Sequence, residues 1–291
     1  MLMKKIALLL CWFAPLLSAA QPATDVYLFD MSVKKDKVVL ANGRNVTPHK
    51  GYDNQPFFHP QQPLIYYASS TDSSRTDLKS YNYRTGATRQ LTTTREGEFS
   101  PTLTEDGRFL SCIVQRANGQ QDLAKFPLAG GAPTVLVNNL KVGYHAWIDD
   151  TRLLLNVLVG TGNELHYLDL TTRRDSVVAR NIGRSLKRIP RQRAISFMEK
   201  QPGGSWLIKR FDTRTLAIST IAPALPGSED VAWTANGLML MSDGEQIFSL
   251  QPDSGNAWQP VLMQGPATKL NKATRLAVSP ANDRVAVVVS E

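Results

Sequence analysis

A repeat of 42 to 45 residues constrains the fold of this chain more than any other feature. Apolar residues that precede a polar turn and a second apolar run recur at Phe58, Leu103, Trp147, Ile189, Trp233 and Val278. Each unit reads as a short strand, a turn, an apolar β-rich strand, a polar loop, a third strand and a fourth short strand. Four short strands in a unit of this length are typical of a β-propeller blade. The repeat therefore predicts an all-β fold, a six-bladed β-propeller.

The second and third strands of the units are the most clearly marked. Second strands are predicted at Leu64–Tyr67, Phe109–Val114, Leu153–Val159, Ala194–Met198, Leu238–Met241 and Val285–Val289. Third strands are predicted at Leu78–Tyr83, Leu123–Leu128, Leu165–Leu170, Trp206–Phe211 and Gln246–Leu250. No long helical periodicity competes with this pattern beyond the first 20 residues.

The two ends of the chain supply complementary halves of one unit. Arg275–Ser279 and Arg284–Val289 have the pattern of its first and second strands. Val26–Asp30 and Asn45–Thr47 have the pattern of its third and fourth, with residues 34–41 enlarging the hairpin between them. Sharing one blade leaves no unpaired terminal edge, so we expect the N- and C-terminal strands to close the ring. An open solenoid is the alternative, but its ends would need caps rather than complementary half-units.

Residues 1–20 have the pattern of a secretory signal peptide, with Lys4 and Lys5 before the apolar run Ile6–Leu17 and small residues at the end. The run is shorter than the ~20 residues that a membrane-spanning helix needs. An acylated Cys11 is a weaker alternative, because no small residue precedes it. We expect a periplasmic or secreted protein in which residues 21–291 form a single propeller domain, with no transmembrane segment after signal cleavage.

Charge and cysteine content narrow the classes of partner. Loss of Lys4 and Lys5 would lower the formal net charge from +8 to +6, and the remaining basic residues are scattered. Together with export, this excludes nucleic acid as an expected partner. Cys112 would be the one cysteine left after signal cleavage, so no intramolecular disulfide is predicted, and its apolar surroundings in the sequence predict a buried strand residue. We expect a monomer.

The repeats resemble the WD40-like (PD40) units of TolB-type six-bladed propellers, whose signature is Ser-Pro-Asp-Gly followed by an apolar strand. Ser100–Phe109 is the best match, and Ala277–Arg284 is the next. The resemblance covers about residues 25–291 and concerns only the propeller part of TolB. It implies an exported scaffold that binds a partner.

The sequence contains no motif that is typical of a particular catalysed reaction. The histidines His49, His59, His145 and His166 are isolated, and neither a His-Glu-x-x-His nor a Gly-x-Ser-x-Gly motif is present. We therefore predict no catalytic residue, no metal site and no cofactor.

Polar residues in the loops that enter the first strands are the candidate ligand-binding residues, because such loops meet at one mouth of a propeller channel. They are Tyr52, Asp53, Asn54, Glu98, Tyr144, His145, Arg184, Asp230 and Arg275. We expect all of them to be exposed and loop-borne. Asp53 and Glu98 occupy equivalent positions in adjacent units and are the best carboxylate pair. Trp147 and Trp233 also match in position and are expected to pack between blades.

The mixture of charges at this mouth favours a non-enzymatic scaffold that binds a protein, peptide or glycan of the cell envelope. The alternative is a hydrolase or lyase that acts on envelope carbohydrate through channel carboxylates, with calcium as an optional ion. Several acids converging on the channel would favour the enzyme, whereas alternating acids and bases favour binding.

Overall fold

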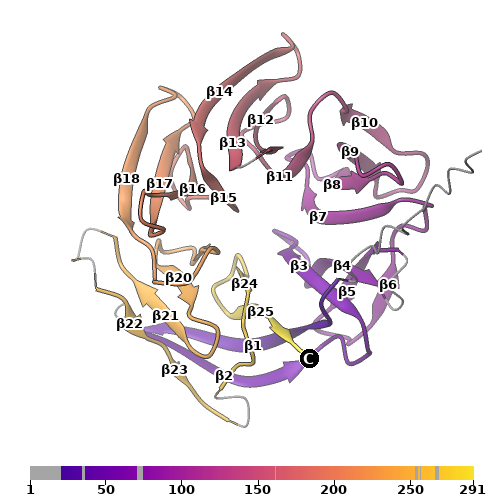
Figure 1. The fold of residues 1–291 in the computed structure, drawn as a ribbon. Helices are drawn as coiled ribbons and strands as arrows, with labels where there is room; N and C mark the ends of the chain where they lie inside the picture. The colour runs from indigo at the N-terminus through magenta and orange to yellow at the C-terminus, as the bar shows by residue number, and fades with distance from the viewer. Residues whose placement is uncertain are drawn as a thin grey trace, which may run out of the picture.

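The computed structural model describes residues 21–34, 37–70, 75–160, 162–252, 255, 257–265 and 269–291. The regular elements in these ranges are β-strands, and the described residues include no helix long and apolar enough to cross a membrane. The strands form sheets that radiate from a common axis (Figure 1). The predicted all-β, six-bladed propeller is therefore confirmed. The predicted signal peptide and Cys11 lie outside the described residues.

Five blades are continuous in sequence, and in each of them four strands follow one another as an antiparallel meander from the axis to the rim (Figure 1). The first two are β3 (Tyr52–Phe58), β4 (Leu64–Ser70), β5 (Asp77–Asn82) and β6 (Thr88–Gln90), then β7 (Gly97–Leu103), β8 (Phe109–Gln115), β9 (Gln121–Pro127) and β10 (Thr134–Val137). The third is β11 (Val142–Trp147), β12 (Arg152–Val159), β13 (Gly162–Asp169) and β14 (Arg174–Arg180). The last two are β15 (Ile182–Arg188), β16 (Ala194–Lys200), β17 (Trp206–Asp212) and β18 (Ile218–Pro223), then β19 (Ala232–Trp233), β20 (Met239–Ser242), β21 (Ile247–Leu250) and β22 (Gln259–Pro260). Every predicted second and third strand of these blades overlaps an observed strand.

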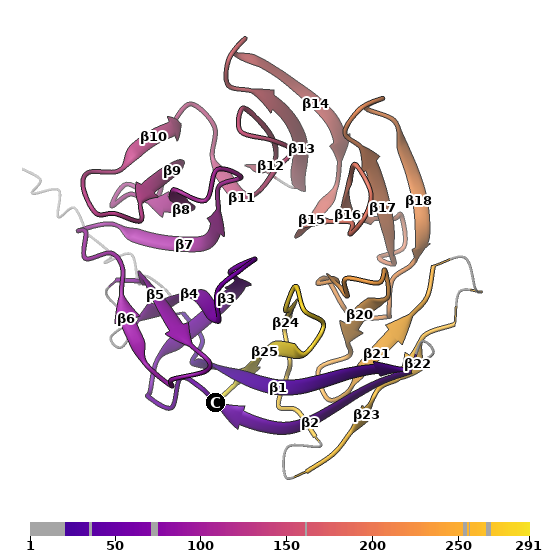
Figure 2. The same cartoon turned by 180° about the vertical axis from the view of Figure 1, so that it is seen from behind.

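The remaining blade is composite, because it combines both ends of the chain (Figure 2). Its strands, from the axis outward, are β24 (Arg275–Val278), β25 (Arg284–Ser290), β1 (Thr24–Lys34) and β2 (Lys37–Asn45), and the short β23 (Leu262–Met263) adds to β2 at the rim. β1 and β25 are antiparallel and stay in register from Thr24 opposite Ser290 to Asp30 opposite Arg284. One parallel bridge, between Thr24 and Tyr52, joins this blade to the next.

The predicted fourth strand of the composite blade, Asn45–Thr47, is wrong. The observed fourth strand, β2, ends at Asn45, and residues 37–41, which were predicted to enlarge the hairpin, are paired with β1. β2 lies at the rim, where many of its side chains meet solvent, so its polar composition is that of an outer strand rather than a loop. Thr47 follows the strand and accepts a hydrogen bond from the backbone N of Val26 at 2.9 Å.

The apolar run of β25 is explained by burial on both faces of the composite blade. Val285 and Val287 face β20 and β21 of one neighbouring blade, within a cluster that includes Phe29. Ala286 and Val288 face β3 and β4 of the other, within a cluster that includes Phe58. Because successive side chains of a strand point to opposite faces, a sheet covered on both sides has no polar alternation.

Similar clusters of buried apolar residues fill the seams between the other neighbouring blades. Phe197 and Phe211 are fully buried in the seam between the β11–β14 and β15–β18 blades. Cys112 is fully buried in the seam between the first two continuous blades, so its prediction as a buried strand residue is confirmed. Burial raises the pKa of this thiol well above its ordinary value.

The same side-chain hydrogen bond, from a tryptophan to a serine, joins neighbouring blades in two seams. The indole Nε1 of Trp147 donates to the hydroxyl of Ser111 in the preceding blade at 2.8 Å, and Trp233 makes the same 2.8 Å bond to Ser196. Both indoles are buried, which agrees with their predicted packing between blades. His145 also contacts Ser111, at 2.7 Å between Nε2 and the hydroxyl.

Candidate ligand-binding channel

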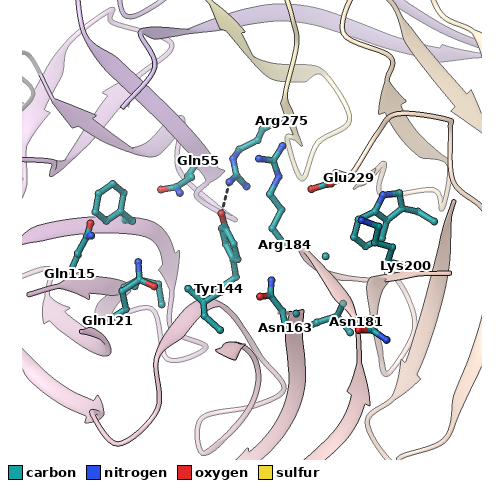
Figure 3. Close-up of a pocket in the computed structure, with 18 of the residues that line it drawn as sticks. Gln55, Gln115, Gln121, Tyr144, Asn163, Asn181, Arg184, Lys200, Glu229 and Arg275 are labelled. Carbon is teal, nitrogen blue, oxygen red and sulfur yellow. Dashed lines mark hydrogen bonds between the residues drawn. The ribbon is translucent and has the colours of Figure 1, made fainter. Parts of the chain in front are cut away.

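Two cavities follow the axis of the ring. The larger has a volume of about 590 Å³ and lies among the beginnings of the first strands and the turns between second and third strands, for example Gly143, Gln115 and Asn163. We call it the entering-loop cavity (Figure 3). The smaller, of about 230 Å³, lies beside the later halves of the first strands, for example Thr102 and Trp147, and is the turn-side cavity.

Four residues line both cavities and mark the boundary between them. They are Gln55, Tyr144, Arg184 and Arg275, which we call the channel belt. The belt residues come from four different blades, since they belong to β3, β11, β15 and β24. The sequence positions of these residues are far apart, so only the closing of the blades around an axis brings them together.

The two arginines of the belt extend across the channel. Arg275 begins β24, yet its Nη2 donates to the hydroxyl of Tyr144, three blades away, at 2.8 Å, and its guanidinium carbon lies 5.1 Å from the centre of that ring (Figure 3). Arg184 begins in β15, and its Nη2 donates to the carbonyl of Thr274 at 2.9 Å. Because Thr274 directly precedes Arg275, these contacts bring the two guanidinium groups to the same place in the channel.

Positive charge at the belt is not matched by a carboxylate in contact. Among the residues that the structure describes, no carboxylate oxygen lies within 4.0 Å of a guanidinium nitrogen of Arg184 or Arg275. The Nε of Arg184 is buried without a hydrogen-bond partner in the described part of the chain. Burial disfavours the charge of Arg275, but Tyr144 and Asp230 more than offset this effect and raise its pKa. Arg275 is therefore a cation.

Asp230 is the acidic residue whose charge acts on Arg275. It precedes β19, is 4% exposed, and lines the turn-side cavity. One carboxylate oxygen accepts a hydrogen bond from the backbone N of Leu276 at 2.9 Å. That bond fixes the carboxylate to the chain beside Arg275 instead of directing it into a bidentate pair with the guanidinium.

Bulges in the first strands direct side chains toward the axis. The register of β3 shifts between Asn54 and Phe57, where Gln55 has a φ of 58°, and that of β7 shifts between Phe99 and Thr102, where Ser100 has a φ of 54°. The two positive-φ residues are 45 positions apart, one repeat. Gln55 Oε1 accepts a hydrogen bond from the backbone N of Ser100 at 2.7 Å. A bulge re-aims the side chains beside it, and here it brings Gln55 into the belt.

The nine predicted ligand-binding residues divide into three groups. Tyr52, Tyr144, Arg184 and Arg275 line the entering-loop cavity. His145 and Asp230 line only the turn-side cavity, while Asp53, Asn54 and Glu98 line neither. The expectation that all nine are exposed and loop-borne is wrong, because all except Asp230 lie in first strands. Asp53 and Glu98 are fully buried. The sequence did not reveal that the first strands begin before these residues.

Asp53 faces the seam between the composite blade and the first continuous blade. Its carboxylate lies 3.2 Å from His49 Nε2, and its backbone carbonyl accepts a hydrogen bond from Thr24 of β1 at 3.0 Å. Burial raises the pKa of Asp53 to about 6, although His49 partly offsets the rise. Asp53 is therefore part of the contact between blades.

Glu98 occupies the equivalent position one blade later and has different partners. Thr92 donates to one carboxylate oxygen at 3.0 Å and Thr94 donates to the other. Burial raises the pKa of Glu98 to about 7 against these two hydrogen bonds, and the neighbouring Asp77 adds to the rise. Asp53 and Glu98 thus contact different partners in different seams. They do not form the carboxylate pair that their spacing predicted.

Several cavity residues are not among the nine predicted ligand-binding residues. Amide side chains line much of the entering-loop cavity: Gln55, Gln115, Gln121, Asn163 and Asn181 (Figure 3). Gln115 and Gln121 flank the β8–β9 turn, and Asn163 follows the β12–β13 turn. The signal that could have found them is topological, because turns between second and third strands lie at the same mouth as the beginnings of the first strands.

The arrangement offers polar recognition more readily than acid–base or metal chemistry. Within the described ranges no three His, Cys, Asp or Glu side chains are grouped so that they could hold a metal ion. Burial lowers the pKa of His145 to about 3, so this imidazole is neutral and bonded to Ser111. The entering-loop cavity presents three cations, one carboxylate, two phenols and several amides.

No family model matches the chain, and no curated protein matches it. Solved structures do resemble it. A putative TolB from Agrobacterium tumefaciens is 14% identical with a TM-score of 0.70, and the match covers 93% of this chain and 99% of that one. A gluconolactonase from Xanthomonas campestris is 12% identical with a TM-score of 0.64, covering 94% and 99%. An oligogalacturonate lyase from Vibrio parahaemolyticus is 14% identical with a TM-score of 0.54, covering 93% and 98%.

These likenesses identify the fold as a TolB-like β-propeller, as the repeats predicted. Similar propellers include proteins named as enzymes as well as TolB, so the fold alone does not define an activity.

Proposed function

We propose that this chain is an exported, non-enzymatic binding propeller that engages a peptide segment of an envelope protein at the entering-loop cavity. The observation that carries the proposal is the channel belt together with the amide-lined cavity above it. Amides both donate and accept hydrogen bonds, so they match the N–H and C=O groups of an extended peptide. A volume of about 590 Å³ accommodates a few residues of such a segment.

The aromatic groups of the cavity favour a peptide over a neutral sugar. Sugar recognition commonly needs an open aromatic face, but Arg275 lies over the ring of Tyr144 and Lys200 lies 5.8 Å from the ring centre of Trp206. Trp206 is also covered by Gly183, where an added Cβ would lie 3.1 Å from the indole.

The alternative hydrolase is less well supported because of where three of the acids lie. Asp53 and Glu98 are buried in separate seams, and Asp230 is bonded to backbone. Glycoside hydrolysis needs two carboxyl groups on either side of one bond, so these three acids offer no such pair.

A recovery experiment tests the proposal. Immobilised residues 21–291 would be incubated with an envelope extract, in parallel with a Gln115→Trp/Asn163→Trp variant that obstructs the entering-loop cavity. Asp150→Trp/Asn236→Trp is the matched control, because both of its residues lie in turns between first and second strands. We expect the unmodified chain and the control to recover the same protein, and the obstructed variant to lose it.

Equal recovery by the obstructed variant would contradict the proposed site. The same extract should be assayed for new reducing ends or unsaturated products from polysaccharide. Their formation by the unmodified chain, and not by the obstructed variant, would instead support the enzymatic alternative.

A further inference from the structure

We propose that Arg184 and Arg275 form a carboxylate-binding site at the channel belt, and that it takes a carboxylate group of the bound peptide. This inference rests on the proposed function and names the chemical group that the cavity recognises. The group enters through the entering-loop cavity and stops at the belt, where both guanidinium groups are reached.

The first observation is the convergence of two cations from different blades. Arg184 reaches Thr274, and the next residue, Arg275, reaches Tyr144, so the side chains meet across the channel. Bringing two like charges together is unfavourable unless an anion lies between or beside them. An anion held by both would make charge-assisted bonds, and planar guanidinium groups match the two oxygens of a carboxylate.

The second observation is that both arginines have N–H donors that make no hydrogen bond to the residues that the structure describes. Each guanidinium carries five N–H donors, and the structure gives one hydrogen bond to Arg184 and one to Arg275 within its described residues. The buried Nε of Arg184 has no partner there. These donors lie at a cavity wall, where a ligand reaches them.

The third observation is that the two arginines are held in place before a ligand arrives. The hydroxyl of Tyr144 accepts from Arg275, and the Thr274 carbonyl accepts from Arg184. Fixing a long side chain in advance removes part of the entropy cost of binding. Tyr144 also presents its ring to Arg275, which orients the plane of that guanidinium.

The charge of the cavity favours an anion as well. The side chains that line the entering-loop cavity include three cations, Arg184, Lys200 and Arg275, and one acid, Glu229. Glu229 is exposed, so solvent screens its charge more than that of the half-buried arginines. The net positive potential draws carboxylates toward the belt.

Pools of synthetic octapeptides with random sequence provide the probe. One pool has acetylated N-termini and amidated C-termini, so its carboxylates are side chains of Asp and Glu. A second pool has acetylated N-termini and free C-termini. Peptides that stay bound to residues 21–291 at low ionic strength are identified by mass spectrometry, and representative binders are measured by isothermal titration calorimetry.

We expect enrichment of Asp or Glu in the amidated pool if the ligand group is a side chain. If the group is a terminal carboxylate, we expect binding from the free pool and none from the amidated pool. In either case Arg275→Gln and Arg184→Gln should each weaken the selected peptide at least tenfold. Arg193→Gln, which removes an equal charge from the exposed β15–β16 turn, should leave its affinity within twofold.

Three outcomes would overturn the inference. They are binding from neither pool, binding of peptides without dependence on both arginines, and arginine-dependent binding of an oligogalacturonate in the absence of peptide binding. Unchanged thermal unfolding of the Arg→Gln variants establishes that lost affinity is not lost folding.

The recovery experiment separates this inference from the proposed function. If Gln115→Trp/Asn163→Trp abolishes partner recovery while Arg275→Gln and Arg184→Gln retain it, the cavity binds a partner without a carboxylate contact and only the inference fails. If the obstructed variant also retains the partner, the proposed function fails with it.

Discussion

In the seam between the blades of β7–β10 and β11–β14, Trp147 and His145 both bond to the hydroxyl of Ser111. In the channel, the guanidinium groups of Arg184 and Arg275 keep donors that have no partner among the residues that the structure describes. Tyr144 and His145 are consecutive, yet one contacts the channel cation and the other is buried in the seam. The seam hydroxyl of Ser111 is thus used by contacts within the fold, whereas guanidinium donors of the channel are accessible to a ligand.

The difference follows the repeat. Trp147 and Trp233 make the same bond in two seams, and Thr47 and Thr92, 45 positions apart, each accept a hydrogen bond from the third strand of their blade. Arg184 and Arg275 do not make matching contacts, since one bonds to a carbonyl and the other to a phenol. In these examples, polar residues whose contacts recur from blade to blade stabilise the fold. The two arginines, whose contacts do not recur, lie in the channel.

The largest expected effect is the difference in free energy of unfolding between a substitution in a seam and one in the channel. Trp147→Ala should lower the free energy of unfolding by about 3–5 kcal/mol, because it empties a packed site and leaves Ser111 with one partner fewer. Arg184→Ala should change it by less than about 1 kcal/mol, since one hydrogen bond of a half-buried group is lost. Urea unfolding measures both, and equal losses would abolish the distinction.

A second prediction uses pH to compare a buried acid of a seam with an exposed acid of the channel mouth. The pKa of Glu98 is about 7 in the folded chain against an ordinary value of 4.5, so the folded chain binds more protons than the unfolded chain between these values. Stability should therefore fall as pH rises from about 4.5 to 8. The loss due to Glu98 is on the order of 3 kcal/mol at about 1.4 kcal/mol per pKa unit.

Glu98→Gln should remove most of this fall and be more stable than the unmodified chain at pH 8, while Glu229→Gln should leave the pH profile unchanged. A smaller slope should persist below about pH 6 in Glu98→Gln, because burial also raises the pKa of Asp53. Chemical unfolding at four pH values between 4.5 and 8 gives the profile. An unmodified chain whose stability rises over this range would contradict the burial of a protonated Glu98.

The smallest effect compares two seams with each other. Ser111→Ala and Ser196→Ala each leave a buried indole N–H unpaired, at a cost of roughly 1–3 kcal/mol. Ser111→Ala should cost more, because it also removes the contact with His145. Melting temperatures of the two variants test this order, and a larger loss for Ser196→Ala would show that the histidine contact contributes nothing.

Sequence reasoning recovered the fold because the repeat marks each blade several times. Val285–Val289 and the corresponding second strands are apolar on both faces. This pattern is typical of a strand whose blade is covered on both faces by neighbouring blades. The predicted proximity of Tyr144, Arg184 and Arg275 is confirmed, since all three line one cavity. Asp53 and Glu98 were misplaced because a bulge of one residue changes which side chains face the axis, and spacing alone does not reveal a bulge.

The pairing of β1 with β25 joins residues that are more than 250 positions apart, from Thr24 to Ser290. During synthesis, β1 cannot pair with β25 until β25 has been made. Closing so long a loop is slow, and it places the decisive step of folding after translation. Until then the apolar faces of β1 and β25 are exposed to association with other chains, so a cell that makes this protein benefits from a chaperone that shields its earliest strands.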